Sequence, residues 1–328
     1  MLSVAFLLPS APPPRLLQAL PESTDELRVY RVAHDDALPP ADTHIVAVVW
    51  MPPTAPDRLD DFLVLHPEVE WVHSLSAGVD SIGGVIKSRM LDSRIQLTNG
   101  RGAFSDSLAE YTIAAALHFT KQFKRCEQNR RAKRWEQFEM ATIAGKTMGF
   151  VGWGHIGQTT ARLAAPLGLR VIALRRNPSK PAAPGEPTLA ATYGPSEQAD
   201  FYAQCDYVVC SLPLTDESRR AVGAAAFAAM KPSCIFISLG RGAAVDEAAL
   251  CAALTSGQIA GAACDVFEKE PLPADSPLWE CENLLVTAHN ADLTSDYCDL
   301  AVKTWRDNLE CYRRGATLAT PVDKASGY

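Results

Sequence analysis

Three ionisable residues in the second half of the chain, Arg241, Glu270 and His289, each follow a short apolar run that is typical of a buried strand. If these strands are parallel, their carboxyl ends meet at one edge of a sheet, where ligands bind in open α/β folds, so the three side chains can converge. A guanidinium pairs with anions, an imidazole can deliver a proton near neutral pH, and a carboxylate beside an imidazolium favours its charged form. Each residue alone is more often structural, but together with a glycine-rich turn upstream they favour catalysis.

That turn is the G-x-G-x-x-G pattern of Gly152, Gly154 and Gly157, which lies between an apolar strand and a helical segment. Glycine allows a tight turn, close approach of the backbone to a pyrophosphate, and close packing of the helix on the strand. The pyrophosphate would rest at the helix N-terminus, near His155 and Ile156. The strand–turn–helix–strand spacing favours dinucleotide binding over a purely structural turn.

Two arginines follow the second strand of this unit. An acid at that point would accept a hydrogen bond from the ribose 2′-hydroxyl, whereas Arg175 and Arg176 can grip a 2′-phosphate. The sequence therefore favours NADP(H), with NAD(H) possible, and Arg175 is the better candidate by its position. The alternative is that one or both arginines simply cover the surface.

The elements that must position these residues form two α/β series. At 328 residues the chain exceeds the usual size of one hydrophobic core, so two domains are expected. Residues 1–100 alternate continuous apolar runs with helical stretches, which indicates a parallel sheet covered on both faces. Ser105 to Trp135 is predicted as one long helix. The strands predicted in the second series are 148–152, 170–174, 206–211, 234–238, 259–266 and 284–288.

Two other segments complete the pattern. Residues 179–198 are rich in Pro, Gly and small side chains and are predicted to be a surface loop. Residues 294–315 have the spacing of an amphipathic helix. The predicted fold class is α/β, with doubly wound parallel sheets.

Composition excludes several kinds of partner. A net charge of −7 argues against a general nucleic-acid surface, and the basic run at 129–134 is interpreted as a solvated helix end. The nine cysteines, without a CxxC pair, indicate reduced thiols and a cytoplasmic protein, and no metal site is predicted. The apolar start of the chain is better explained as a strand than as a signal peptide, and no run is long enough to span a membrane.

In this order, the segments resemble the D-isomer-specific 2-hydroxyacid dehydrogenases. The similarity runs over nearly the whole chain, through SLSAGVDSI, TNGRGAFSDSLAEYTIAAAL, GKTMGFVGWGHIG, VVCSLPLTDESRRAV, SLGRGAAVDEAAL, DVFEKEPLP and LLVTAHNADLT. The resemblance implies two Rossmann-like or flavodoxin-like domains with the active site in the interdomain cleft. It also implies a cofactor domain of residues 101–292 inserted into a discontinuous substrate domain of residues 1–100 and 293–328.

The resemblance assigns the catalytic roles to Arg241, Glu270 and His289. Arg241 would pair with the carboxylate of a 2-oxo acid and polarise its ketone. His289 would supply the proton that the developing alkoxide needs, and Glu270 would orient the imidazole. Backbone amides around Ala77 and Gly78 would bind the substrate carboxylate.

The resemblance also implies cofactor contacts outside the glycine turn. Ser105 matches a hydroxyl position near the nicotinamide. Asp265 matches an acid that faces the carboxamide, with capping or local structure as its alternative role. The remaining implied contacts lie in the SLPLT and SLGRG turns and are Leu212, Pro213, Leu239 and Gly240.

Three positions depart from the family pattern. Ala288 stands where a proline commonly precedes the histidine, so the loop loses a fixed φ and is expected to be less rigid. Asn290 follows where an apolar residue is usual, which bears on substrate preference. Ser238 replaces a common asparagine. None of these changes removes a reacting group.

The predicted activity is reversible reduction of a small 2-oxo acid, such as glyoxylate or hydroxypyruvate, by a cytoplasmic homodimer that prefers NADP(H). One alternative is a dehydrogenase for another 2-oxo acid. The other is a corepressor-like, nucleotide-sensing binding protein, because fold alone does not decide function.

Overall fold

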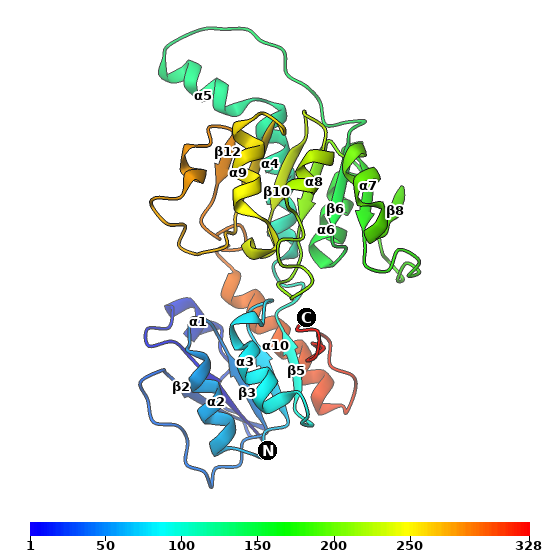
Figure 1. Cartoon of the computed structure of the whole chain (residues 1–328). Helices are drawn as coiled ribbons and strands as arrows, with labels where there is room; N and C mark the ends of the chain where they lie inside the picture. The colour runs from blue at the N-terminus through cyan, green and yellow to red at the C-terminus, as the bar shows by residue number, and fades with distance from the viewer. The chain divides into compact units, whose positions relative to one another are not determined.

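The chain divides into two compact units, each built on its own parallel sheet. The computed structural model describes residues 1–328 (Figure 1). Unit 1 comprises Met1–Phe104 and Ser295–Tyr328, and unit 2 comprises Ser105–Thr294. The chain therefore leaves unit 1 after Phe104 and returns to it at Ser295.

Unit 1 has a five-stranded sheet in the order β2-β1-β3-β4-β5, which is the flavodoxin-like order. Its elements are β1 (Leu2–Leu7), α1 (Pro14–Ala19), β2 (Leu27–Val32), β3 (Ala47–Trp50), α2 (Pro56–Leu65), β4 (Trp71–Ser74), α3 (Gly83–Val85), β5 (Gln96–Asn99) and α10 (Tyr297–Arg313). The central strands β3 and β4 are buried at every position, which explains their continuous apolar runs. The C-terminal helix α10 returns to this sheet, and its Trp305 packs edge-on against Phe6 at 4.9 Å.

Unit 2 has a seven-stranded parallel sheet in the order β12-β11-β10-β9-β6-β7-β8. Its strands are β6 (Thr147–Val151), β7 (Arg170–Leu174), β8 (Ala191–Tyr193), β9 (Tyr207–Cys210), β10 (Ile235–Ser238), β11 (Gly261–Cys264) and β12 (Leu284–Val286). Its helices are α4 (Ser105–Thr120), α5 (Phe123–Arg131), α6 (His155–Ala164), α7 (Gln198–Gln204), α8 (Ala224–Ala229) and α9 (Glu247–Thr255). Counted from β6, this is the order of a Rossmann sheet with one added strand.

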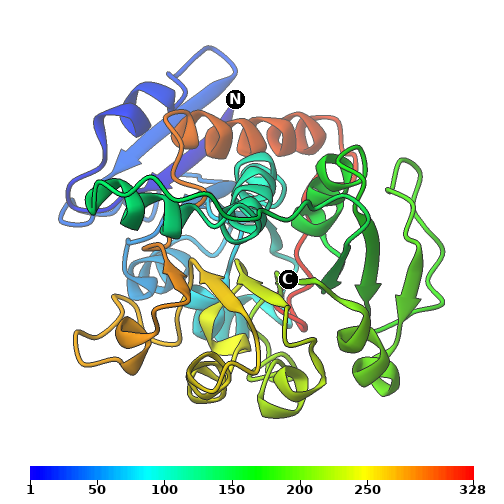
Figure 2. The ribbon, with the colours of Figure 1, turned by 90° about the horizontal axis from the view of Figure 1, so that it is seen from above.

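Two hydrophobic cores cover the larger sheet. On one face α4 and α6 pack through Ala115 and Ala161, and on the other α7, α8 and α9 pack through Phe201, Phe227 and Leu250 (Figure 2). Both faces are thus shielded, as a parallel sheet requires. The predicted α/β class with doubly wound sheets is confirmed, and each of the six strands predicted in this region is present.

The prediction of one helix from Ser105 to Trp135 is wrong. The helix α4 ends at Thr120, and Gln122 adopts the left-handed region with φ of 50° before α5 begins. A non-glycine residue in that region ends a helix, and local contacts hold the turn. Lys121 Nζ donates to Ala141 O at 2.7 Å, and Gln122 Nε2 donates to Glu139 O at 2.9 Å.

The interpretation of residues 179–198 as a surface loop is also wrong in part. Ala191–Tyr193 forms β8, which pairs in parallel with β7 as the edge strand. Three residues are too short to show a period-2 pattern, and only pairing with β7 makes them a strand. The strands β2 and β5 of unit 1 were likewise not predicted. No helix of the protein has both the length and the apolar surface needed to cross a membrane.

Candidate active site

His289 and Glu270 form a direct pair at the carboxyl edge of the larger sheet. His289 Nδ1 lies 2.7 Å from Glu270 Oε2, and the other oxygen, Oε1, accepts from the backbone N of Phe267 at 2.9 Å. Glu270 is therefore fixed at both oxygens and fixes the imidazole in turn. This leaves Nε2 as the ring nitrogen that Glu270 does not engage, so it can face a substrate.

The backbone at His289 has an unusual conformation, which hydrogen bonds to Asp265 stabilise. Its φ is 49°, a region that non-glycine residues seldom adopt and that costs of order 1 kcal/mol. The backbone N of His289 donates to Asp265 O at 2.8 Å. Such a conformation persists only where the surroundings enforce it.

The Asp265 carboxylate fixes the residues on both sides of His289. It is 1% exposed, and its Oδ1 accepts from Thr287 Oγ1 at 2.6 Å and from the backbone N of Asn290 at 3.1 Å. The backbone N of Ala291 lies 3.2 Å from each carboxylate oxygen. The loop that carries His289 is thus tied to β11 although Ala288 lacks the ring constraint of a proline. These contacts agree with the alternative role of Asp265, which is to stabilise the local structure. A contact of Asp265 with the cofactor carboxamide stays a prediction.

Tyr111 of α4 backs this arrangement. Its hydroxyl lies 2.9 Å from Thr287 Oγ1. Burial raises the pKa of Tyr111 to about 12, and the nearby Asp265 charge acts in the same direction. The hydroxyl is therefore protonated at neutral pH and forms a hydrogen bond with Thr287.

Arg241 lies in the turn after β10, which abuts the loop that carries Glu270. Its Nη1 donates to Gly240 O at 3.0 Å. A Cβ added at Gly242 would lie 1.9 Å from the carbonyl carbon of Phe267, so only glycine permits this approach. Since Phe267 also binds Glu270, the close approach places the Arg241 turn against the pair of His289 and Glu270.

Asp292 joins the same group, and the sequence did not single it out. Burial raises the pKa of its carboxyl, and the Asp265 charge adds to this, while the charges of His289 and Arg241 oppose it. The carboxyl is thus within electrostatic range of the His289 and Arg241 side chains. In the sequence, only its position three residues after His289 could have indicated that Asp292 belongs to this site.

The glycine turn has the form that a dinucleotide needs. Gly152 has φ of 89°, and a Cβ there would lie 2.9 Å from Leu212 Cδ2. Gly154 is the N-cap of α6, no side chain caps this helix, and a Cβ at Gly154 would meet nothing within 4 Å. The first backbone N–H groups of α6 are therefore accessible beside open space, as a pyrophosphate requires. Gly157 packs against Phe150, 3.3 Å from the position of its missing Cβ.

Further predicted cofactor residues lie at the start of α6 and in the turns after β9 and β10. His155 is exposed and Ile156 half-buried in the first turn of α6. A Cβ at Gly240 would lie 2.3 Å from Leu212 O, so the turns after β9 and β10 touch backbone to backbone. Pro213 follows in the first turn, where its carbonyl accepts from Ser218 Oγ at 2.6 Å, and Leu239 is buried in the second.

Three further predicted residues are Ala77, Gly78 and Ser105. Ala77 and Gly78 belong to unit 1, after β4, where Asn99 Nδ2 donates to Ala77 O at 2.5 Å and Ser76 Oγ donates to Gly78 O at 2.7 Å. Ser105 is the first residue of α4 and is 6% exposed. The contacts that join Arg241, Glu270 and His289 all lie within unit 2.

The two arginines after β7 differ in their surroundings. The Arg175 side chain is 12% exposed and forms an ion pair with Glu186, with Nη1 and Oε1 3.5 Å apart. The Arg176 side chain is 63% exposed and pairs with the exposed Glu217 at 2.9 Å. The sequence did not single out Glu186 because it lies in the segment interpreted as a surface loop.

These features define a Rossmann-type dehydrogenase in which a histidine–carboxylate pair lies at the cofactor edge of the sheet. Residues 113–291, more than half of the chain, match the family model described as "D-isomer specific 2-hydroxyacid dehydrogenase, NAD binding domain". The chain belongs to this family, as its motifs predicted. It is an NAD(P)-dependent 2-hydroxyacid dehydrogenase, which reduces 2-oxo acids in the reverse direction.

Individual relatives agree with this assignment. A glyoxylate reductase of Aeropyrum pernix is 31% identical over 278 residues, which are 82% of this chain and 81% of that protein. A glyoxylate/hydroxypyruvate reductase B of an Enterobacter species is 33% identical over 74% of each chain. The crystal structure of an NADPH-dependent glyoxylate/hydroxypyruvate reductase from Sinorhizobium meliloti, in complex with NADP and sulfate, is 28% identical with a TM-score of 0.83, covering 99% of this chain and all of that one.

The role of Asp265 in holding the loop predicts a loss of both stability and turnover in Asp265→Asn. The amide keeps an acceptor oxygen for Thr287 and Asn290 but turns an NH2 group toward the backbone N–H of Ala291, which should lower the free energy of unfolding by about 1–3 kcal/mol. Urea unfolding and turnover measured on the same preparations test this. Thr287→Ser keeps the hydroxyl and serves as the control, with an expected change below about 0.5 kcal/mol. Unchanged stability and turnover in Asp265→Asn would contradict the role.

Proposed function

We propose that the protein reduces glyoxylate or hydroxypyruvate with NADPH and acts reversibly on the corresponding D-2-hydroxy acids. The observation that carries the proposal is the 2.7 Å pair of His289 Nδ1 and Glu270 Oε2, beside Arg241 and the glycine turn. Two relatives bear the name of a reductase of these acids, and the Sinorhizobium structure contains NADP. These names support the substrate class and the cofactor.

Each side chain has one task in the proposed reaction. Arg241 pairs with the substrate carboxylate and draws electron density from the ketone. His289 Nε2 gives its proton to the carbonyl oxygen, and Glu270 keeps the ring oriented. We also assign the backbone amides of Ala77 and Gly78 to the substrate carboxylate, as the family resemblance implies. The bound nicotinamide supplies the hydride.

The preference for NADP(H) rests on the end of β7. Arg175 and Arg176 stand where an acid would favour the ribose 2′-hydroxyl of NAD(H). Two guanidinium groups instead favour a phosphate. The first residues of α6 and the turns after β9 and β10 would hold the rest of the dinucleotide.

A panel of 2-oxo acids assayed with both cofactors tests the function. NADPH oxidation should require an added 2-oxo acid and should be fastest with glyoxylate or hydroxypyruvate. For the same acid, kcat/KM should be several-fold higher with NADPH than with NADH. The measurement is kcat/KM for each pair, with pyruvate and a bulky 2-oxo acid as comparison substrates. Binding of NADPH without turnover of any acid would contradict the proposal and favour a nucleotide-sensing protein.

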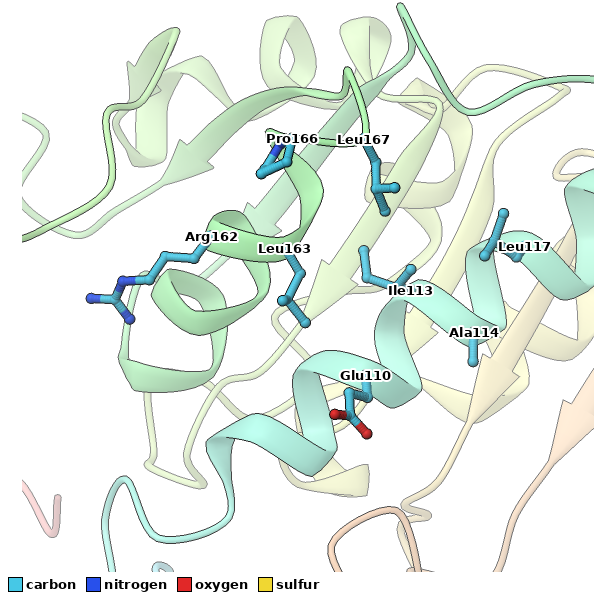
Figure 3. A pocket seen from close by; sticks show the side chains of 8 residues that line it. All are labelled: Glu110, Ile113, Ala114, Leu117, Arg162, Leu163, Pro166 and Leu167. Carbon is cyan, nitrogen blue, oxygen red and sulfur yellow. The ribbon is translucent and has the colours of Figure 1, made fainter.

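We further propose that the protein is a homodimer joined through unit 2. A groove of about 450 Å³ runs between α4 and α6, and Ile113, Leu117, Leu163 and Leu167 line it (Figure 3). Leu163 and Leu167 are 40% and 43% exposed. A contiguous apolar strip of this kind is unfavourable in water and typical of an interface.

A projecting arm, residues 121–143, adds further apolar surface to unit 2 (Figure 1). Trp135, Phe123 and Met140 on this arm are 94%, 51% and 46% exposed. The arm is nevertheless ordered internally, because the Arg125 guanidinium lies 4.2 Å from the ring centre of Phe138 and pairs with Glu136 at 2.8 Å. An ordered segment with so exposed a tryptophan favours a second copy of this chain as its partner.

The molar mass in solution tests the dimer. Light scattering should give twice the mass of the 35.4 kDa chain for the wild type and a monomer for the double variant Leu163→Glu and Leu167→Glu. Val64→Glu changes a more exposed apolar residue on α2 of unit 1 and should remain dimeric. A monomeric wild type at micromolar concentration, or a dimer that survives the double variant, would overturn this proposal.

We also propose a cytoplasmic location. All nine cysteines are free, and burial raises the pKa of Cys210 to about 11, so its thiol stays protonated. Buried free thiols are typical of a reducing compartment.

A further inference from the structure

The segment between β7 and β8 folds back and buries an acid. The Glu186 side chain is only 5% exposed. Its Oε1 accepts from Trp153 Nε1 and faces Arg175 Nη1 at 3.5 Å, while its Oε2 accepts from the backbone N of Ala183 at 2.9 Å. Those donors hold the pKa of the carboxyl below its usual range, the Ala183 hydrogen bond most, so the group is a carboxylate at neutral pH.

Local geometry keeps Glu186 in this place. Ala183 and Glu186 close a four-residue turn with Pro184 and Gly185 at its centre, and Gly185 has φ of 76°. Pro followed by a glycine of positive φ is the preferred sequence of a type II turn. Arg162 Nη2 of α6 donates to Gly185 O at 3.2 Å, which anchors the turn to the helix that begins at the glycine motif.

Glu186 thereby lies at the corner of the dinucleotide site. The backbone N of Gly152 donates to Leu174 O at 3.1 Å, so the glycine turn and the end of β7 are in contact. Trp153 belongs to the first of these segments and Arg175 to the second, and the carboxylate touches both. In a Rossmann unit the adenosine ribose lies at this junction.

We propose that Glu186 is a specificity-determining residue of the cofactor site. Its carboxylate occupies Arg175 in place of a 2′-phosphate, which leaves Arg176 as the main phosphate ligand and moderates the preference for NADP(H) over NAD(H). The inference deepens the proposed function and depends on its dinucleotide site. It also makes Arg176 the main ligand of the 2′-phosphate, whereas the sequence favoured Arg175 by its position.

The surroundings of Arg175 and Arg176 explain why Arg176 is the main phosphate ligand. The pair of Arg175 and Glu186 is almost removed from solvent, so water and salt screen it little. The pair of Arg176 and Glu217 is exposed on both sides, at 63% and 74%, and such surface pairs contribute little stability. A phosphate with two negative charges can therefore replace Glu217 at Arg176 far more easily than Glu186 at Arg175.

Calorimetric binding of adenosine 2′,5′-bisphosphate and 5′-AMP to the full chain tests the proposal without any turnover. The two ligands differ only in the 2′-phosphate. Glu186→Gln removes the competing charge and should tighten the bisphosphate about fivefold, as expected when a weakly screened negative charge beside Arg175 is removed, while 5′-AMP changes less than about twofold. The control Glu282→Gln removes an exposed acid elsewhere in unit 2 and should change neither affinity.

Arginine variants complete the test. Arg176→Ala should weaken bisphosphate binding about tenfold or more, as for the loss of a charge-assisted contact, and Arg175→Ala about threefold or less. In the Glu186→Gln background, Arg175→Ala should cost more than in the wild type, because Arg175 is then released to the phosphate. Melting temperatures within a few degrees of the wild type establish that the variants fold.

Equal shifts for both ligands in Glu186→Gln, weaker binding of the bisphosphate, or a larger loss in Arg175→Ala than in Arg176→Ala would each overturn the inference. These results would leave the proposed dehydrogenase standing, provided that NADP⁺ and NAD⁺ bind. A wild-type chain that binds neither dinucleotide would contradict the proposed function itself and this inference with it.

Discussion

A single buried carboxylate underlies the geometry of the active site. Asp265 accepts hydrogen bonds from Thr287, Asn290 and Ala291, which flank His289 on both sides. His289 can therefore keep its left-handed backbone conformation, and its ring meets Glu270 at 2.7 Å. A buried charge is stable only when it is fully hydrogen-bonded, so the loop and the acid depend on each other.

Two glycines extend this constraint to the rest of the site. Gly242 lets the Arg241 turn touch the backbone of Phe267, and Gly240 lets the same turn touch the backbone of Leu212 beside the glycine motif. The turns after β6, β9, β10 and β11 are thus packed directly on one another. The parallel sheet brings the strand ends to one edge, and these contacts set the spacing of Arg241, Glu270 and His289 on that edge.

The large elements and the grouping of Arg241, Glu270 and His289 at one sheet edge could be predicted from the sequence because both follow local rules. Continuous apolar runs mark buried parallel strands, and polar residues just after such runs mark the ligand edge. β8 was missed because three residues of an edge strand have no periodic signal of their own. The break at Gln122 was missed because its cause is a set of contacts with residues 139–141, which helical spacing does not reveal. Glu186 and Asp292 were missed for the same reason: burial and ion pairing are tertiary properties, and in the sequence both are ordinary acids near a loop.

In the proposed reaction His289, oriented by Glu270, delivers the proton during reduction. Steady-state turnover and NADPH binding of His289→Gln, measured side by side, test this role. We expect kcat to fall by a factor of about 10²–10⁴, the usual contribution of general acid catalysis, while the Kd for NADPH stays within about twofold. Near-normal turnover in this variant would show that His289 is not the proton donor.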